Sequence, residues 1–215
     1  MTRFYNELIT CPNCKKKSSF KIYDSINSTL NPELKEDLMN LNLFNFKCPN
    51  CNNETDVFYR TLYHDMENNV MINFVPGSDD LDSEVQTFLS YQKEIDDRFE
   101  NLMSNYRFRF VSELGQFVEK IQIFDAGYDD RIIESMKFII MVCDSNESKI
   151  EYDFIVFDKV GLNRFQFYLI YNQEVIASMA FDESLYNQIS EEFSLEPLDE
   201  YIIDEYWAYR KCTES

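Results

Sequence analysis

The chain has 215 residues and a mass of 25.8 kDa, which is enough for one ordinary domain with a small additional module. Hydrophobic residues make up 45% of it and aromatic residues 16%, so it can form a buried core and is not an intrinsically disordered chain. Its net charge of −19 disfavours binding to nucleic-acid phosphates over the whole surface, and we expect no measurable binding to generic duplex DNA at physiological salt.

The first elements are predicted from the pattern of apolar residues. Residues 4–10 and 18–27 alternate between apolar and polar side chains, as short strands do. A helix is predicted to begin at Asn31, because the proline that follows suits a first helical position and leucines then recur on one face. Residues 57–74 predict a β-hairpin, and Pro76-Gly77-Ser78 ends this part of the chain.

Two Cys-Pro-Asn-Cys motifs lie among these elements. Cys11 and Cys14 belong to the first motif and Cys48 and Cys51 to the second, with 33 residues between the motifs. Two residues between the cysteines allow one turn to direct both sulfurs at one ion, and two such turns complete a tetrahedral Cys₄ site for Zn²⁺. Because thiolates fill all four positions, the predicted zinc is structural. Residues 1–78 are therefore predicted to form a zinc-ribbon-like module with an inserted helix.

Other uses of the cysteines remain open as alternatives. An iron–sulfur cluster also accepts four thiolates. A thioredoxin-like redox role is less favoured, because one motif would be enough for it and no βαβ unit is predicted around either motif. Cys143 falls on an apolar helix face and is expected in the core, and Cys212 lies in the C-terminal tail.

Residues 79–215 are predicted to form an acidic α+β body. A long helix is predicted over residues 80–106, where apolar residues follow a heptad-like spacing. We expect this helix to pack on the protein's own body, with a homodimer seam as the alternative. Two further helices follow, separated by a turn at Gly127. Residues 152–181 then change to a period of two, which predicts an antiparallel β-meander followed by C-terminal helices.

Two groups of titratable residues are weaker candidates for chemistry. His64 is the only histidine, and Asp65 follows it. A lone His beside Asp can act as a base or a metal ligand, or it can be a structural residue of the hairpin, bonded to a carbonyl or carboxylate. The residues 129–134 include three carboxylates that could bind a divalent cation, or could cap a helix and form ion pairs. We favour the structural interpretation of both groups and keep an enzyme, such as a hydrolase, as the alternative.

The charge is distributed unevenly along the chain. Residues 1–60 contain eight basic and seven acidic residues, whereas residues 61–215 contain 12 and 32. A small basic cluster lies beside the first cysteine motif and comprises Lys15, Lys16, Lys17 and Lys21. We interpret this cluster as a solvated loop, with contact to nucleic acid through Lys15–Lys21 as the less favoured alternative.

The paired Cys-Pro-x-Cys motifs, the Asn31-Pro32-Glu33-Leu34 helix start and Tyr63-His64-Asp65-Met66 together resemble the CpXC domain family. That family is bacterial and archaeal, and the resemblance implies a metal-ligand role for Cys11, Cys14, Cys48 and Cys51 only. The resemblance is clear over residues 9–76, looser over 107–138 and weak over the C-terminal meander. Lys15 and Asn52 follow the two motifs, at positions where zinc knuckles often have glycine because the backbone is left-handed there.

From these observations we expect a zinc-binding interaction or adaptor protein whose partner is another protein. No N-terminal run resembles a signal peptide, and no apolar stretch is long enough to span a membrane. We therefore expect an intracellular, cytoplasmic protein, in whose reducing surroundings paired C-x-x-C motifs bind metal rather than form disulfides.

Overall fold

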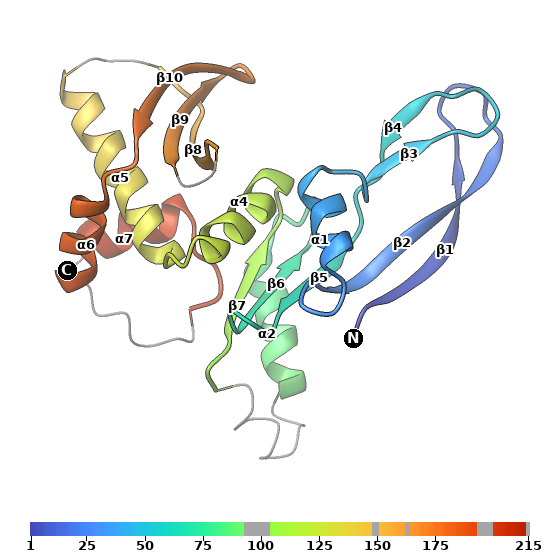
Figure 1. Cartoon of the computed structure of the whole chain (residues 1–215), viewed down its shortest axis with the longest axis horizontal. Helices are drawn as coiled ribbons and strands as arrows, with labels where there is room; N and C mark the ends of the chain where they lie inside the picture. The colour runs from blue at the N-terminus through green and yellow to red at the C-terminus, as the bar shows by residue number, and fades with distance from the viewer. Residues whose placement is uncertain (93–103, 148–150, 162–163, 193–199, 214–215) are drawn as a thin grey trace. The chain divides into compact units, whose positions relative to one another are not determined.

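The computed structural model describes residues 1–92, 104–147, 151–161, 164–192 and 200–213. Helices and strands are mixed along the chain, which confirms the predicted α+β class (Figure 1). The chain divides into two compact units, residues 1–118 and 119–215. Each unit is described by itself below.

The first unit is built on a five-stranded sheet with the order β1-β2-β5-β6-β7. Its strands are β1 (Arg3–Thr10), β2 (Lys17–Asn27), β5 (Thr61–Asp65), β6 (Val70–Phe74) and β7 (Arg107–Val111). β1 pairs with β2, and β5 with β6, in antiparallel fashion, whereas β2 with β5 and β6 with β7 are parallel. Helix α1 (Pro32–Met39) follows β2 and precedes the second cysteine motif, and it begins at the proline, as predicted.

β2 is much longer than its contact with β5, which involves only residues 25–27. The rest of the β1–β2 hairpin extends beyond the sheet as a two-stranded ribbon (Figure 1). A second small hairpin of β3 (Asn45–Lys47) and β4 (Glu54–Asp56) lies beside it. Phe20 of the ribbon packs edge-on against Phe46 of β3, with ring centroids 5.7 Å apart, and so joins the two hairpins.

The sequence did not predict β7. The helix expected over residues 80–106 is observed as α2 (Leu81–Gln92), and residues 93–103 lie outside the described ranges. A turn occupies 104–105 and β7 begins at Arg107, so the predicted helix end at 106 is wrong. Val85 is buried, and Phe88 packs against Phe108 and Phe110 of β7 at 5.0 and 5.6 Å, so the described part of this helix packs on its own unit. The homodimer seam stays a prediction.

The division into compact units falls at 118/119, and the domain boundary predicted at residue 78 stays a prediction. The first unit extends this far because the parallel pairing of β7 with β6 draws residues 107–111 into the first sheet. Helix α4 (Leu114–Asp125) begins in the same unit, where Phe117 stacks on Phe74 with ring centroids 5.0 Å apart.

The second unit places helices on one face of a three-stranded antiparallel sheet, whose order is β10-β9-β8. Its further elements are α5 (Asp130–Glu147), β8 (Phe154–Lys159), β9 (Phe165–Tyr171), β10 (Glu174–Ala180), α6 (Glu183–Glu192) and α7 (Glu205–Thr213). Gly127 has a φ of +78° and allows the turn between α4 and α5. The core packs residues of α5 and α6 against the sheet and includes Ile132, Ile133, Met136, Phe157, Phe167 and Ile189.

None of the helices within the described ranges has both the length and the apolar composition that crossing a membrane requires.

Candidate metal centre

The two cysteine motifs form the same backbone turn twice. In the first, the N–H of Lys15 donates to the carbonyl oxygen of Cys11 at 3.0 Å, and the N–H of Cys11 donates to the carbonyl of Lys16 at 3.0 Å. In the second, the N–H of Asn52 donates to the carbonyl of Cys48 at 2.9 Å, and the N–H of Cys48 to that of Asn53 at 2.8 Å. Each turn thus holds its two cysteines in the same relative orientation.

Both turns need a left-handed residue directly after the second cysteine. Lys15 has a φ of +61° and Asn52 a φ of +58°, at the two positions where the sequence analysis expected a left-handed backbone. Both residues have a Cβ that crowds the following carbonyl, but the short polar side chain of asparagine can hydrogen-bond locally and offset this cost, which the side chain of lysine does not do. The first turn therefore stores more backbone strain than the second.

This difference leads to a prediction about stability. Lys15→Gly removes the Cβ and should raise the free energy of unfolding of the zinc-loaded chain by about 1 kcal/mol, since relief of left-handed strain outweighs the added entropy of the unfolded chain. Lys16→Gly is the matched control, because Lys16 is not left-handed; it should lower the free energy of unfolding by a few tenths to 1 kcal/mol. Denaturant titration measures both, and equal effects of the two changes would contradict the strain argument.

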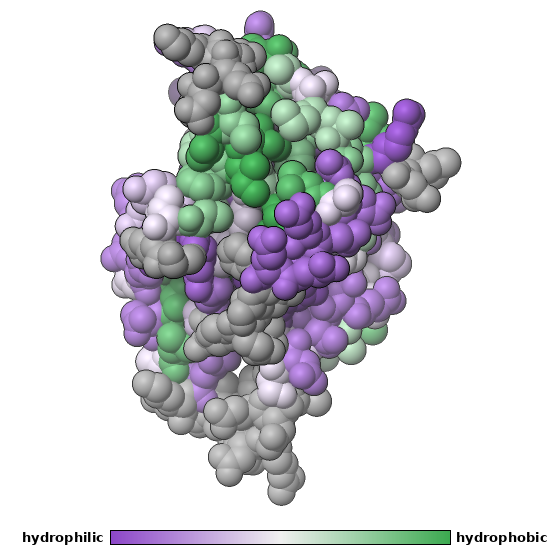
Figure 2. Space-filling model, turned by 90° about the vertical axis from the view of Figure 1, so that its left-hand side faces the viewer, coloured by the Kyte–Doolittle hydropathy of each residue, from purple (hydrophilic) through white to green (hydrophobic). Residues whose placement is uncertain are grey.

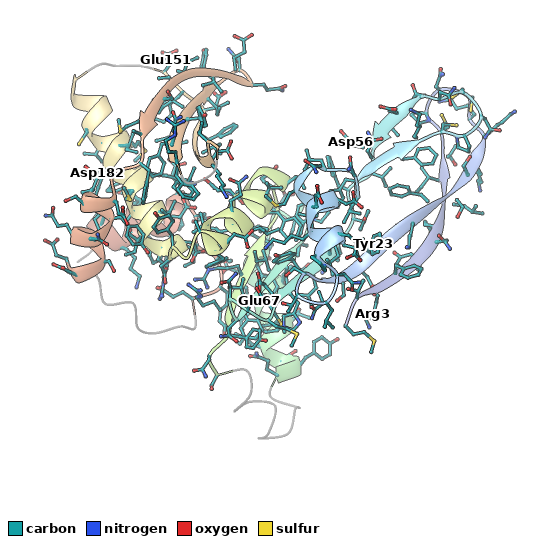
Figure 3. The ribbon with its side chains drawn as sticks, in the orientation of Figure 1. Arg3, Tyr23, Asp56, Glu67, Glu151 and Asp182 are labelled. Atoms are coloured by element: carbon teal, nitrogen blue, oxygen red, sulfur yellow. The ribbon has the colours of Figure 1, made fainter. Side chains whose placement is uncertain are left out.

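The four cysteine sulfurs converge at the end of the ribbon. Sγ of Cys11 lies 3.6 Å from Sγ of Cys51, Sγ of Cys14 lies 3.7 Å from Sγ of Cys48, and all four sulfurs lie within 4.8 Å of one another. A Zn–S bond of about 2.3 Å implies S···S distances of about 3.8 Å in a regular tetrahedron. The donor set and its spacing therefore fit a tetrahedral thiolate-bound ion. Figure 3 shows the sulfur atoms gathered there.

The protein favours thiolates at part of this cluster. Burial raises the pKa of Cys48, but the backbone N–H groups of Asn50 and Cys51 and the neighbouring thiols outweigh it and lower this pKa to about 6. The N–H of Asn53 lowers the pKa of Cys51. For Cys14, the N–H of Lys16 lowers the pKa, but burial and the other three thiols raise it to about 11. Four thiols this close together cannot all lose their protons without a positive charge between them. A bound cation would provide that charge and displace the remaining protons.

The side chains around the cluster are partly apolar and partly amide. Cys11 and Cys48 are fully buried, and Phe46 seals them from the side of β3. The two asparagines inside the motifs act differently: Asn13 donates its amide to Sγ of Cys51 at 3.6 Å, whereas Asn50 donates to the hydroxyl of Ser18 at 3.2 Å. The buried pair and the amide together hold the sulfurs in place from several sides.

Comparison with known proteins bears on this site. A protein-family model described as CpXC protein matches residues 9–137, which is more than half of the chain and includes all four cysteines. The chain belongs to the CpXC family. No curated protein and no solved structure matches it. The resemblance seen in the sequence is thereby confirmed, and the match also includes β7 and the start of α5 in this CpXC protein.

His64 lies on β5, within the first unit. Asn27 accepts a hydrogen bond from the N–H of Leu30 through its Oδ1, so its amide NH₂ faces Nδ1 of His64 at 3.3 Å. Nδ1 must then be the acceptor, and Nε2 carries the proton, donating to the hydroxyl of Tyr106 at 3.1 Å. The ring is more than half buried and neutral. Its nitrogens bond to an amide and a hydroxyl rather than to the predicted carbonyl or carboxylate.

Asp65 takes no part in the His64 contacts. Its carboxylate accepts hydrogen bonds from the backbone N–H groups of Glu67 and Asn68 at 2.9 and 3.1 Å, and it forms an ion pair with Lys35 at 3.9 Å. Asp65 therefore caps the β5–β6 turn. Although they are adjacent in sequence, the two residues are held by different partners, because successive side chains of a strand point to opposite faces.

The environment of His64 makes a pH-dependent prediction. Burial and the N-terminal amine lower its pKa, and Asp65 only partly offsets this. The folded chain thus binds the proton more weakly than the unfolded chain, so stability is fully present above the unfolded pKa of about 6.5 and is lost as the pH falls to the folded value. We expect the free energy of unfolding to fall less between pH 7.5 and 5.5 in His64→Gln than in the wild type. Parallel curves for the two would contradict a buried neutral His64.

The carboxylates predicted as a second candidate site lie in a buried ionic network. Asp130 and Glu134 of α5 bind the ammonium of Lys120 on α4 at 3.2 and 2.9 Å, and all three side chains are at most 6% exposed. Lys137 binds Glu134 at 3.3 Å and Glu119 at 2.7 Å. We refer to Glu119, Lys120, Asp130, Glu134 and Lys137 as the α4–α5 network. Its carboxylates are already bound by ammonium groups, which accords with the structural interpretation.

Titration of this network is governed by its own charges. Burial raises the pKa of Glu134, but Lys120 and Lys137 outweigh it and hold this pKa below its usual range. Burial lowers the pKa of Lys120, but Glu134 and Asp130 outweigh it and raise this pKa. Asp129 is also engaged: its Oδ1 accepts from the N–H of Arg131 at 3.0 Å and so caps α5, as predicted.

Proposed function

We propose that this CpXC protein binds one structural Zn²⁺ through Cys11, Cys14, Cys48 and Cys51, in a zinc-ribbon-like module. The observation that carries the proposal is the spacing of the four sulfurs, whose 3.6 and 3.7 Å separations fit the edges of a ZnS₄ tetrahedron. The four ligands come from two turns on different hairpins, so the ion would fasten the β1–β2 ribbon to the β3–β4 hairpin. Such a site leaves no open position for a substrate, and its role is to stabilise the fold.

We further propose that the protein acts by binding another protein. Two points support binding rather than catalysis. The carboxylates of the α4–α5 network are bound by lysines, and His64 is held between Asn27 and Tyr106 without a carboxylate. A hydrolase would need one of these groups to be available to a substrate or to an activated water.

Affinity purification of the zinc-loaded full chain from its native cell, with quantitative mass spectrometry, tests this proposal. We expect one protein to be enriched in near-stoichiometric amount with the wild type. The same protein should be recovered with His64→Ala. Loss of biological activity in a His64→Ala variant that keeps its melting temperature would instead support the enzyme hypothesis.

A further inference from the structure

The three-stranded sheet of the second unit has two different edges, and side chains cover one of them. On β8, the N–H of Phe157 donates to Oε1 of Glu119 at 2.5 Å. The N–H of Lys159 donates to Oε1 of Gln122 at 3.2 Å. Both acceptors are on α4, so this helix satisfies the donors that β8 would otherwise offer to another strand.

The β10 edge has no such cover. The N–H of Phe181 donates to the carbonyl of Phe165 on β9 at 3.0 Å. Because donors alternate in direction along an antiparallel strand, the N–H groups of Ser178 and Ala180 point away from β9. Within the part of the chain that the structure describes, no group accepts a hydrogen bond from either N–H. The register of β10 against β9 shifts between Val175 and Ala177, and the pairing is regular from Ala177 to the end of the strand.

The face of this sheet opposite the core, which no helix of the described residues covers, is also more apolar than exposed sheet faces usually are. Phe157 and Phe167 point into the core, so their neighbours in sequence point to the opposite face. On that outer face, Phe154 pairs with Ile170, which pairs with Val175, and together they form an apolar row across all three strands. An exposed face of an antiparallel sheet is usually polar.

The row ends in solvent at β10. Val175 is 58% exposed. Met179 pairs with Phe167 and therefore lies on the core-side face, where it is 49% exposed at this edge. In Figure 2, hydrophobic residues gather in the upper part, at the height of β10 and the end of α5 in Figure 1. Natural edge strands are commonly protected by lysine, proline or inward-pointing charge, yet the only charged residue of β10 is Glu174 at its start. An added strand would lie beside Val175 on the outer face and beside Met179 on the core-side face, and it would accept hydrogen bonds from the outward N–H groups.

Charge identifies the kind of segment that fits. Asp153 and Asp182 lie just outside the strands of the sheet, and Asp158 and Glu174 add carboxylates within β8 and β10. Residues 119–215 contain 21 acidic and eight basic residues, and three of the basic residues lie in the buried interior as Lys120, Arg131 and Lys137. A second copy of this chain would bring the same acidic rim to the interface, and like charges would oppose each other. A basic segment would meet opposite charge.

We propose that β10 binds an extended segment of a partner protein as a fourth strand, and that this segment carries apolar residues at alternate positions and Lys or Arg around them. Backbone hydrogen bonds to Ser178 and Ala180 would provide the pairing. The apolar side chains would continue the row of Phe154, Ile170 and Val175. This inference rests on the proposed role in protein binding and names the surface that performs it.

Selection of random 12-residue peptides displayed on phage, against the zinc-loaded full chain, tests the inference. We expect enriched peptides to be basic and to alternate apolar with polar residues. Synthesised peptides should bind more weakly as salt increases. Ser178→Pro removes one outward N–H and should weaken their binding at least tenfold, whereas Ser178→Thr keeps the N–H and should change it less than twofold.

Three outcomes would overturn the inference: no enrichment, enrichment of acidic peptides, or binding that is unchanged in a folded Ser178→Pro variant. Sedimentation that shows a dimer abolished by Ser178→Pro would identify a second copy as the occupant and would also overturn it.

Circular dichroism checks that Ser178→Pro is folded, and Val175→Lys provides a second variant that leaves every β10 N–H in place. A native partner whose binding ignores both variants would remove the β10 inference while leaving the proposed function standing.

Discussion

Replacing one cysteine of the cluster with serine should abolish zinc binding and unfold the ribbon end of the first unit. The purified wild type should contain one zinc per chain, whereas Cys14→Ser or Cys48→Ser should contain none. Zinc binding at structural Cys sites contributes roughly 10–16 kcal/mol, which exceeds the stability that a small ribbon can gain from its own apolar contacts. Elemental analysis measures the zinc, and hydrogen exchange measures the loss of amide protection in β1–β4.

The chain offers a matched control for this experiment. Cys143 and Cys212 are exposed and lie outside the cluster, so the core position expected for Cys143 is wrong. Cys143→Ser and Cys212→Ser should therefore keep the full zinc content and the full protection of the ribbon. A wild type without zinc, or one with the brown colour of an iron–sulfur cluster, would contradict the proposed metal. Unfolding confined to the ribbon is expected because α5–α7 belong to the other compact unit.

The sequence was informative where a local pattern determines the structure. The C-x-x-C spacing correctly predicted that the four sulfurs lie together. The zinc-knuckle pattern, which often has glycine after each motif, correctly predicted a left-handed backbone at Lys15 and Asn52, although neither is glycine. Short turns of this kind depend on the residues within them, and for that reason they can be predicted without knowing the rest of the fold.

The sequence did not predict the features that depend on contacts between elements far apart in the chain. β7 was missed although Arg107–Val111 alternates between basic and apolar residues, because the pattern is only five residues long and its parallel partner β6 lies more than 30 residues away. The 129–134 carboxylates were recognised, but their partner Lys120 comes from α4, and only the packing of α4 on α5 places it there. The partners of His64, Asn27 and Tyr106, are likewise distant in sequence.

The α4–α5 network should be far more sensitive to substitution than any surface ion pair. Lys120→Met removes the buried ammonium that Asp130 and Glu134 share, while Glu134 keeps its contact with Lys137, and it should lower the free energy of unfolding of the second unit by about 3–5 kcal/mol. Lys47, which pairs with Glu54 at 2.8 Å on the surface, is the control. Lys47→Met should change the stability by less than about 1 kcal/mol, because water solvates both of its charges.

A double variant separates the cost of an unpaired charge from the net contribution of the pair. Lys120→Met combined with Glu134→Met removes one positive and one negative charge and fills similar volume, so it should recover part of the stability that Lys120→Met loses, while the contact of Lys120 with Asp130 is still missing. Lys137 would still bind Glu119, whose carboxylate also accepts from the N–H of Phe157, so the network would stay connected to β8. Urea titration of the single and double variants provides the comparison. A double variant no more stable than Lys120→Met would mean that the network's own hydrogen bonds, and not the avoidance of an unpaired buried charge, hold α4 against α5.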